Sequence, residues 1–386
     1  MGFLFSDVVA EESVDVTTFG VVANGIADDT VPMQTALTHC SEGRLTCVVP
    51  RGARIRITKP LYLWSGGSLR GERGSEFLLA MADDADRFVF NLGIRGRQRI
   101  AQPHTGSISG LKFRILAGPS DKWADDKSPI SGRVIQFWNV DGSRIQGNWF
   151  SLGSFFYGAT AAQKNKAWLT GPQSRRGIKI LDNEVHAEAV AHGMEGLSVG
   201  YCSEVEIRGN LVVGVGDDPI GIHFCEDVVV AKNRTRGVDG RIYISNSKRV
   251  LVRNNDVRRS PSPVDGKFRA GTALIWVGYD RNARKLWPEP EDIEISDNRL
   301  EYPRDAIDTG GAISIQGGDR IKVTSNKVIN HSKSVRAKAV SLKPYFDLRR
   351  LQFHQLGEVT VVDNSATGRY PLVIDPSRSR VADTSK

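Results

Sequence analysis

The sequence predicts an all-β protein built as a parallel β-helix, and three observations lead to this fold class. Asn210, Asn233 and Asn255 close three similar segments and lie 23 and 22 residues apart. Self-similarity at a fixed period of this size is typical of solenoids. Each period contains two or three short runs of alternating apolar residues, which favours strands over helices. The 39 glycines can supply the tight turns that every period needs.

The composition is that of a globular protein whose charge favours an acidic partner. Of 386 residues, 40% are hydrophobic and 25% are charged, which argues against a disordered chain. No apolar run reaches the roughly 18 residues of a membrane span, and the start of the chain lacks the basic region of a signal peptide. The net charge of +8 favours an acidic ligand, but no compact Lys/Arg run indicates nucleic acid.

We expect one β-helix domain over residues 14–370, preceded by an N-terminal arm at 1–13 and followed by a flexible polar tail at 371–386. Residues 14–60 form a cap segment. In it, a strand at 14–16 precedes a helix that begins near Asp28-Asp29-Thr30, because either aspartate can cap the free N–H groups of the first turn. The predicted buried face of this helix contains Val31, Met33, Ala36 and Leu37.

The cap segment resembles the start of the pectate-lyase-like superfamily. Members of that superfamily carry the phrase D-x-x-x-F/Y-G-A-x-x-D-G-x-x-D-D-T and then V-x-x-P-x-G-x-Y. The residues that match are Asp15, Phe19, Gly20, Gly25, Asp28, Asp29, Thr30, Pro50 and Gly52. Val21 and Asn24 depart from the pattern. The resemblance implies a right-handed parallel β-helix whose N-terminal end is capped by this segment, so Asp28 and Asp29 are expected to be structural.

An aliphatic-x-x-Asn pattern recurs eight times and marks the coils. Its asparagines are Asn148, Asn183, Asn210, Asn233, Asn255, Asn298, Asn326 and Asn364. Each ends a strand at a tight turn. Asn tolerates the left-handed backbone conformation, and stacked Asn side chains can bond from coil to coil. We therefore predict a structural asparagine ladder.

The four cysteines are too few for a disulfide scaffold. Cys202 and Cys225 lie one period apart, so they are expected to stack as small buried residues in adjacent coils. Cys40 and Cys47 are close enough in sequence to form a bridge, but nothing in the sequence requires one.

Spacings between the asparagines vary, and the extra length is expected to form loops on the binding face. The insertion after Asn148 begins with Trp149 and Phe150. The insertion after Asn255 carries four residues suited to sugar rings and carboxylates: Lys267, Arg269, Trp276 and Tyr279.

Acidic residues precede core strands of consecutive coils. They are Glu195, Asp217, Asp218 and Asp239. Because coils of a parallel β-helix stack about 4.8 Å apart, these residues should form an acid row along one edge. Neighbouring carboxylates raise one another's pKa, so that one can donate a proton while another is ionised. Glycoside hydrolysis needs such a pair.

The stretch from Gly216 to Ile222 resembles the G-D-D-C-I-A-I phrase of polygalacturonase-type glycoside hydrolases. That family has N-T-D-G one coil upstream and G-H-G one coil downstream. Here those registers hold Met194-Glu195-Gly196 and Val238-Asp239-Gly240-Arg241, with Lys267-Phe268-Arg269 as a loose counterpart of a later R-I-K phrase. Glu195 thus replaces the family's Asp, and Asp239 stands in the histidine register. His223 is nearby on an alternating strand.

Three functions follow as hypotheses. The first is a hydrolase of an acidic, uronate-containing polysaccharide, with Asp217, Asp218, Glu195 and Asp239 as the candidate catalytic residues. Its substrate-binding candidates are His223, Arg241, Lys267, Arg269, Trp276 and Tyr279. The second is a polysaccharide lyase, in which Lys267 or Arg269 removes a proton and Ca²⁺ or a cationic side chain neutralises the uronate. The third is a phage tailspike-type protein that binds a surface glycan, since the N-terminal phrase is also common in tailspikes.

We rank hydrolysis first, with no metal in the site and no cofactor, or Ca²⁺ if the protein is a lyase. The expected partner is a polysaccharide, with a homotrimer as an option, and no nucleic acid or membrane. The expected location is secreted or extracellular, or on a virion.

Overall fold

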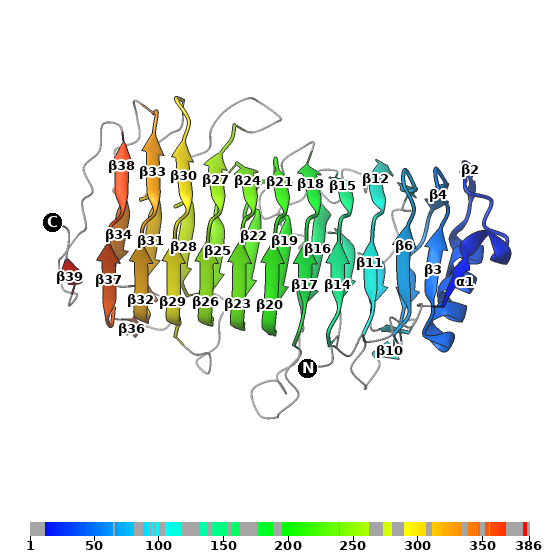
Figure 1. The fold of residues 1–386 in the computed structure, drawn as a ribbon, viewed down its shortest axis with the longest axis horizontal. Coiled ribbons are helices and arrows are strands. Elements are labelled where there is room, and N and C mark those ends of the chain that lie inside the picture. Colours follow the sequence, from blue (N-terminus) through cyan, green and yellow to red (C-terminus); the bar gives the residue numbers. More distant parts are fainter. Residues whose placement is uncertain are drawn as a thin grey trace, which may run out of the picture.

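Figure 1 shows a β-helix whose coils stack in chain order from the N-terminal to the C-terminal end. The computed structural model describes residues 12–64, 66–80, 88–92, 94–95, 98–99, 105–117, 132–137, 141–152, 156–162, 176–187, 195–238, 240–261, 273–279, 289–305, 311–332, 339–343, 345–347, 352–354, 356–367 and 381–383. Within these residues, three long sheets run parallel to one another along the stack, and all their strand pairs are parallel.

The strands of each sheet come from successive coils. The 13-stranded sheet contains β1 (Ser13–Asp15), β3 (Thr46–Val49), β6 (Ser68–Gly71), β11 (Ser107–Ser109), β14 (Arg144–Gln146), β17 (Lys179–Leu181), β20 (Ser203–Arg208), β23 (Glu226–Ala231), β26 (Lys248–Arg253), β29 (Glu291–Ser296), β32 (Asp319–Thr324), β37 (Val359–Val362) and β39 (Val381–Asp383). The 12-stranded sheet contains β2 (Asn24–Asp28), β4 (Arg54–Ile57), β7 (Glu76–Ala80), β12 (Lys112–Ala117), β15 (Trp149–Leu152), β18 (Glu184–Ala187), β21 (Leu211–Val213), β24 (Arg234–Gly237), β27 (Asp256–Arg259), β30 (Arg299–Tyr302), β33 (Lys327–Asn330) and β38 (Ser365–Thr367).

The 10-stranded sheet contains β5 (Leu61–Leu63), β8 (Phe88–Leu92), β13 (Gly132–Phe137), β16 (Phe156–Ala162), β19 (Leu197–Gly200), β22 (Ile220–His223), β25 (Ile242–Ser245), β28 (Ile275–Gly278), β31 (Ile313–Gln316) and β34 (Val340–Lys343). Two short antiparallel pairs accompany these sheets: β9 (Ile94–Arg95) with β10 (Gln98–Arg99), and β35 (Tyr345–Asp347) with β36 (Gln352–His354).

Buried apolar residues alternate with more exposed residues along the strands, and the buried side chains form the core. Inward-facing aliphatic side chains lie in register from coil to coil, so that each buries its neighbours above and below. One such column in the 13-stranded sheet, with every member at most 2% exposed, consists of Val205, Val228, Val250, Ile293, Ile321 and Val359. The predicted all-β, right-handed parallel β-helix is therefore confirmed.

The asparagine ladder joins the 13-stranded and 12-stranded sheets. The Nδ2 atom of each asparagine donates to Oδ1 of the next at 2.9–3.1 Å, from Asn148 through to Asn364. The expectation that these asparagines themselves adopt the left-handed conformation is wrong. The residue before each one has the positive φ instead, for example Asp182 (54°) and Lys232 (57°). That preceding residue makes the bend, which leaves the Asn side chain pointing inward along the stack.

The N-terminal cap contains β1, the short 3-10 helix Val16–Phe19 and α1 (Thr30–Gly43). Met33, Ala36 and Leu37 are fully buried, as predicted, but Val31 is 75% exposed. Thr30 takes the inward place at the start of the helix, because it lies three residues before Met33 and on the same face.

The two cap aspartates have different roles, although the sequence allowed either one to cap the helix. Asp28 Oδ1 accepts a hydrogen bond from the N–H of Thr30 (3.0 Å) at the helix start. Asp29 is fully buried and accepts from the N–H groups of Val22 (2.8 Å) and Ala23 (3.0 Å), which braces the preceding loop.

All four cysteines lie in the described residues. Cys40 and Cys47 form a disulfide with their Cα atoms 5.9 Å apart, which links α1 to β3. Cys202 and Cys225 are buried, take no part in the disulfide and occupy equivalent positions of adjacent coils, as predicted.

Three segments differ from the predicted loops and tail. Trp149 and Phe150 belong to β15, where Phe150 is buried and stacks on Phe113 with ring centroids 5.2 Å apart. Trp276 lies in β28, and Tyr279 follows that strand directly. Residues 381–383 of the expected flexible tail form β39, which pairs with β37 and so extends the sheet through backbone hydrogen bonds.

Candidate functional site

The acid row lies at the edge where the chain passes from the 12-stranded to the 10-stranded sheet. Glu195 and Asp218 each stand two residues before a strand of the 10-stranded sheet, β19 and β22 respectively. The N–H of Gly196 donates to the carbonyl of Asp218 at 3.0 Å, so the two turns are stacked directly on each other. The two acids therefore occupy equivalent positions in adjacent coils, whose strands are spaced by about 4.8 Å.

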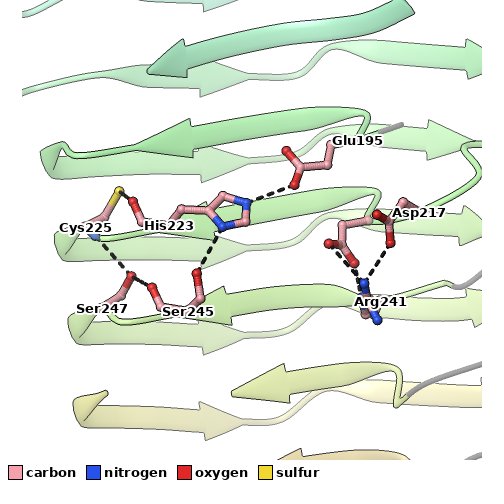
Figure 2. A network of polar contacts seen from close by, with 8 residues as sticks. Glu195, Asp217, His223, Cys225, Arg241, Ser245 and Ser247 are labelled. Carbon is pink, nitrogen blue, oxygen red and sulfur yellow. Dashed lines mark hydrogen bonds and ion pairs between the residues drawn. The ribbon is translucent and has the colours of Figure 1, made fainter. Parts of the chain in front are cut away.

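Arg241, from the next coil, engages both aspartates (Figure 2). Its Nη2 atom lies 2.7 Å from Asp217 Oδ1, and its Nε atom donates to Asp218 Oδ1. The Asp218 side chain is 4% exposed and that of Asp217 is 27% exposed. One guanidinium thus forms ion pairs with two carboxylates, of which only that of Asp217 is substantially exposed to solvent.

This arrangement favours a retained proton. Burial raises the pKa of Asp218 well above its usual range, and the negative charges of Asp217 and Glu195 raise it further, while Arg241 opposes the shift. Two carboxylates that share one cation and a buried site titrate as a pair. The Asp217–Asp218 pair can therefore hold a proton at a pH where an isolated aspartate has lost it.

Glu195 belongs to a second polar chain beside the first. Its Oε1 atom lies 2.9 Å from Nε2 of His223, and Nδ1 of that ring lies 3.0 Å from Oγ of Ser245 (Figure 2). Glu195 and His223 are 14% and 19% exposed, whereas Ser245 is fully buried. Ser245 therefore orients the imidazole from below, and the Glu195–His223 pair faces outward.

Gly221 makes room for this pair. It occupies the outward position between Ile220 and Ile222 on β22, in register with Ser198 and Tyr243. A Cβ atom there would lie 2.9 Å from Glu195 Cδ and 2.9 Å from His223 Nε2. The absence of a side chain at this position allows Glu195 to reach across to His223.

A third set of bonds supports the histidine from the strand end. Ser247 Oγ donates to the carbonyl of Ser245 at 2.8 Å and accepts from the N–H of Cys225 at 3.1 Å. The thiol of Cys225 lies 3.3 Å from the carbonyl of His223. These contacts hold the ends of β22 and β25 in register beneath the imidazole (Figure 2).

Aromatic rings flank the polar groups on the next two coils. Tyr243 and Trp276 stack with parallel ring planes and centroids 4.4 Å apart, and the Arg241 guanidinium lies 5.0 Å from the Tyr243 ring centroid. Trp276 is 8% exposed and Tyr279 is 6% exposed. Both residues were expected to bind substrate from a loop, but they lie largely buried, with Trp276 on a strand of the stack.

The structure brings together five of the residues singled out from the sequence: Glu195, Asp217, Asp218, His223 and Arg241. Three further residues expected in the site lie outside the described residues: Asp239, Lys267 and Arg269. Sequence reasoning missed the bond between Glu195 and His223. A signal existed in Ile220-Gly221-Ile222-His223, where the outward Gly leaves a space beside the outward His.

A metal site requires several protein ligands around one ion. Among the described residues, no group of three or more His, Cys, Asp or Glu side chains has the arrangement to hold one. Asp217 and Asp218 direct oxygens to Arg241, so a cation at this position would have to replace the guanidinium. No helix in the described part of the chain has the length and apolar character of a membrane span.

Comparisons with known proteins agree with the observed architecture. The family model described as right handed beta helix region matches residues 138–347. No curated protein matches the sequence. The chain is similar in structure to the Streptococcus pneumoniae surface protein and adhesin PfbA, with a TM-score of 0.65 and 14% identity over 96% of this chain and 100% of that one.

Two further solved structures resemble it. One is a tailspike protein mutant of E. coli bacteriophage HK620 in complex with a pentasaccharide, with a TM-score of 0.67 and 14% identity over 96% of this chain and 65% of that one. The other is the family 28 exopolygalacturonase of Yersinia enterocolitica, with a TM-score of 0.51 and 12% identity over 92% of this chain and 79% of that one. At these identities the similarity establishes the fold.

Proposed function

Because this chain belongs to the right-handed β-helix family, we propose that it cleaves glycosidic bonds of an acidic polysaccharide by carboxylate acid/base hydrolysis. The observation that carries the proposal is the stacking of Glu195 and Asp218 at equivalent turns of adjacent coils, where they bond to different partners. Asp218 is buried with a raised pKa, whereas Glu195 is held outward by His223. Glycoside hydrolysis requires one carboxylic acid and one carboxylate on either side of the scissile bond.

The proposed division of roles follows from exposure and charge. Asp218, whose pKa is raised by burial, retains the proton and is the proposed acid, and Asp217 shares its Arg241 partner. Glu195 is the ionised partner, and His223 keeps its carboxylate in a fixed orientation. The stacked rings of Tyr243 and Trp276 continue the outer face on the next coils. The half-buried ring of Tyr243, with the buried Trp276 stacked on it, offers apolar contact to a sugar ring beside Arg241.

The choice of substrate and location has separate support. The net charge of +8 favours an anionic polymer over a neutral one. Similar folds include an exopolygalacturonase, a surface adhesin and a tailspike bound to a pentasaccharide. The Cys40–Cys47 disulfide is compatible with an oxidising compartment. We therefore propose a secreted protein or a virion component.

The test combines a polysaccharide panel with three variants. Uronate polymers and neutral polymers are incubated with the wild type, and both reducing ends and absorbance near 235 nm are followed. Asp218→Asn, Asp217→Asn and Glu195→Gln are each expected to lower kcat by about 10²- to 10⁴-fold, the usual contribution of general acid–base catalysis. Asp28→Asn, in the N-terminal cap, is the charge-matched control and should retain wild-type turnover.

Two results would change the proposal. An unsaturated product absorbing near 235 nm, lost with chelator and restored by Ca²⁺, would replace hydrolysis by lyase chemistry. Wild-type turnover in the Asp217, Asp218 and Glu195 variants would remove the acid row from catalysis.

One observation favours a second candidate, a glycan-binding protein that does not cleave its ligand. Arg241 occupies oxygens of both Asp217 and Asp218, as expected of a structural ion pair. In that case the panel should yield saturable binding without new reducing ends. The same three variants would then change affinity by at most about tenfold, since each removes no more than a polar contact to ligand.

A further inference from the structure

A second charged surface lies on the outer face of the 12-stranded sheet, on β24, β27, β30 and β33. These strands are side by side in the C-terminal half of the stack (Figure 1). Their outward positions hold five basic residues and two acidic ones among the described residues. We name this surface the cationic face, and its members are Arg234, Arg236, Arg258, Arg299 and Lys327, with Asp256 and Glu301 between them.

The two carboxylates are no more exposed than the arginines around them and form ion pairs with those arginines. Glu301 is 10% exposed and lies 3.3 Å from Arg258 Nη1 and 2.5 Å from Arg299 Nη2. Asp256 accepts from Arg236 Nη2 at 2.7 Å. The Arg258 and Arg299 side chains are 43% and 47% exposed. Because a guanidinium has five donors, each arginine keeps N–H groups that remain for an incoming anion, in an orientation already set by the carboxylate below.

Two of the five charged register pairs on this face join like charges. Arg236 pairs with Arg258 across β24 and β27, and Arg299 pairs with Lys327 across β30 and β33. Like charges directly opposite on neighbouring strands are destabilising. Arg234 and Lys327 are exposed and form no ion pair with any residue that the structure describes. An anion bound across these rungs would offset the repulsion.

The face formed by the 13-stranded sheet in the same four coils lacks this excess of basic over acidic residues. On β23, β26, β29 and β32 the described residues include five basic side chains against six acidic ones. There the charges alternate from coil to coil: Arg249 bonds to Asp227, and Arg320 bonds to Asp292. The basic and acidic residues on that face nearly balance, whereas the cationic face has a surplus of three basic residues.

We propose that the cationic face binds an acidic polysaccharide lying along the axis of the β-helix. The basic rungs recur about every 4.8 Å, so a linear polymer with a carboxylate on each sugar can meet several in succession. Bidentate Arg–carboxylate contacts suit such a ligand. The face adjoins the acid row, since β24 leads into the turn that carries Arg241. The choice of a polysaccharide rests on the proposed function, but binding here does not require cleavage.

The experiment measures equilibrium binding of polygalacturonate and alginate to the full chain by calorimetry, at low and high salt. The test variant is Arg234→Gln with Lys327→Gln, because neither residue forms an ion pair with a described residue. The matched control is Arg253→Gln with Lys322→Gln, which removes the same charge from the exposed 13-stranded face of these coils. We expect the test variant to bind about tenfold more weakly, the sum of two exposed ionic contacts, and the control to bind like the wild type.

Several outcomes would overturn the inference. Equal weakening in both variants would mean that net charge alone drives binding. Equal affinity for dextran or for single-stranded DNA would exclude a uronate site. Failure of the proposed hydrolysis can be told apart from failure of this inference, because Glu195→Gln is expected to lower turnover and to leave this affinity unchanged. A test variant that binds polygalacturonate with wild-type affinity contradicts the proposal directly.

Discussion

At the scale of single residues, the most informative position is one without a side chain. Gly221 has no positive φ, so alanine is compatible with its backbone. The obstacle is steric, because a Cβ atom would lie 2.9 Å from both Glu195 Cδ and His223 Nε2. Contacts this short force a neighbour to move. The glycine therefore leaves the space in which the two polar groups meet.

We predict that Gly221→Ala separates Glu195 from His223 and lowers kcat by up to about 100-fold, as expected for a displacement of about 1 Å in a catalytic group. KM should change little, because the aromatic and basic contacts to substrate are untouched. The measurement is steady-state kinetics on the polymer that the panel identifies, together with the melting temperature. Adding Glu195→Asp, which shortens the acid by one methylene, should restore part of the lost rate. A fall in kcat that simply follows a loss of folded protein would argue for a structural role only.

Part of this site could be predicted from the sequence, and there is a physical reason why the rest could not. Glu195 and Asp218 could be assigned to neighbouring turns because the period of the repeat determines which residues stack. The contact between Glu195 and His223 joins a turn in one coil to a strand end in the next. It depends on side-chain conformation and on the empty position above Gly221, which the period does not encode. The expectation for Arg241 named substrate carboxylates as its partners, whereas it binds the protein's own aspartates.

At the scale of structural elements, the asparagine ladder links the coils. Asn233 is fully buried, donates to the carbonyl of Ile207 at 2.9 Å, and accepts from the backbone and side-chain N–H groups of Asn210. Each rung therefore satisfies backbone groups of the coil before it. The sequence predicted this ladder because the aliphatic-x-x-Asn pattern recurs eight times. It misassigned the left-handed residue, since the pattern does not show which of two adjacent residues makes the bend.

We predict that Asn233→Ala lowers the free energy of unfolding by about 2–5 kcal/mol, because it leaves at least two buried backbone groups without a partner at about 1–3 kcal/mol each. Urea unfolding followed by circular dichroism would measure the loss. Asn364→Ala is the matched control at the far end of the described ladder, where the side chain is only partly buried. Water can replace its bonds, so its cost should be at most half as large. Equal costs at both positions would show that the ladder is not the source of the stability.

At the scale of the whole molecule, each coil packs mainly against its two neighbours. The three sheets run in chain order from β1 to β39, and the strands that pair belong to adjacent coils. In such an architecture stability is approximately a sum over neighbouring repeats. A change at one end should therefore affect the nearest coils and fade with distance along the stack.

The disulfide in the N-terminal cap provides a test of this locality. Cys40 and Cys47 are separated by seven residues, and closing so short a loop corresponds to about 2–3 kcal/mol in the chain-entropy treatment. Reduction, or replacement of both cysteines by serine, should therefore loosen α1 and the two strands that it contacts, β3 and β5. Hydrogen exchange should become faster at residues 30–63 and stay unchanged at residues 195–238, which carry the acid row several coils away. Faster exchange in both regions would indicate that the β-helix unfolds as one cooperative unit, in which case the cap would control the stability of the site directly.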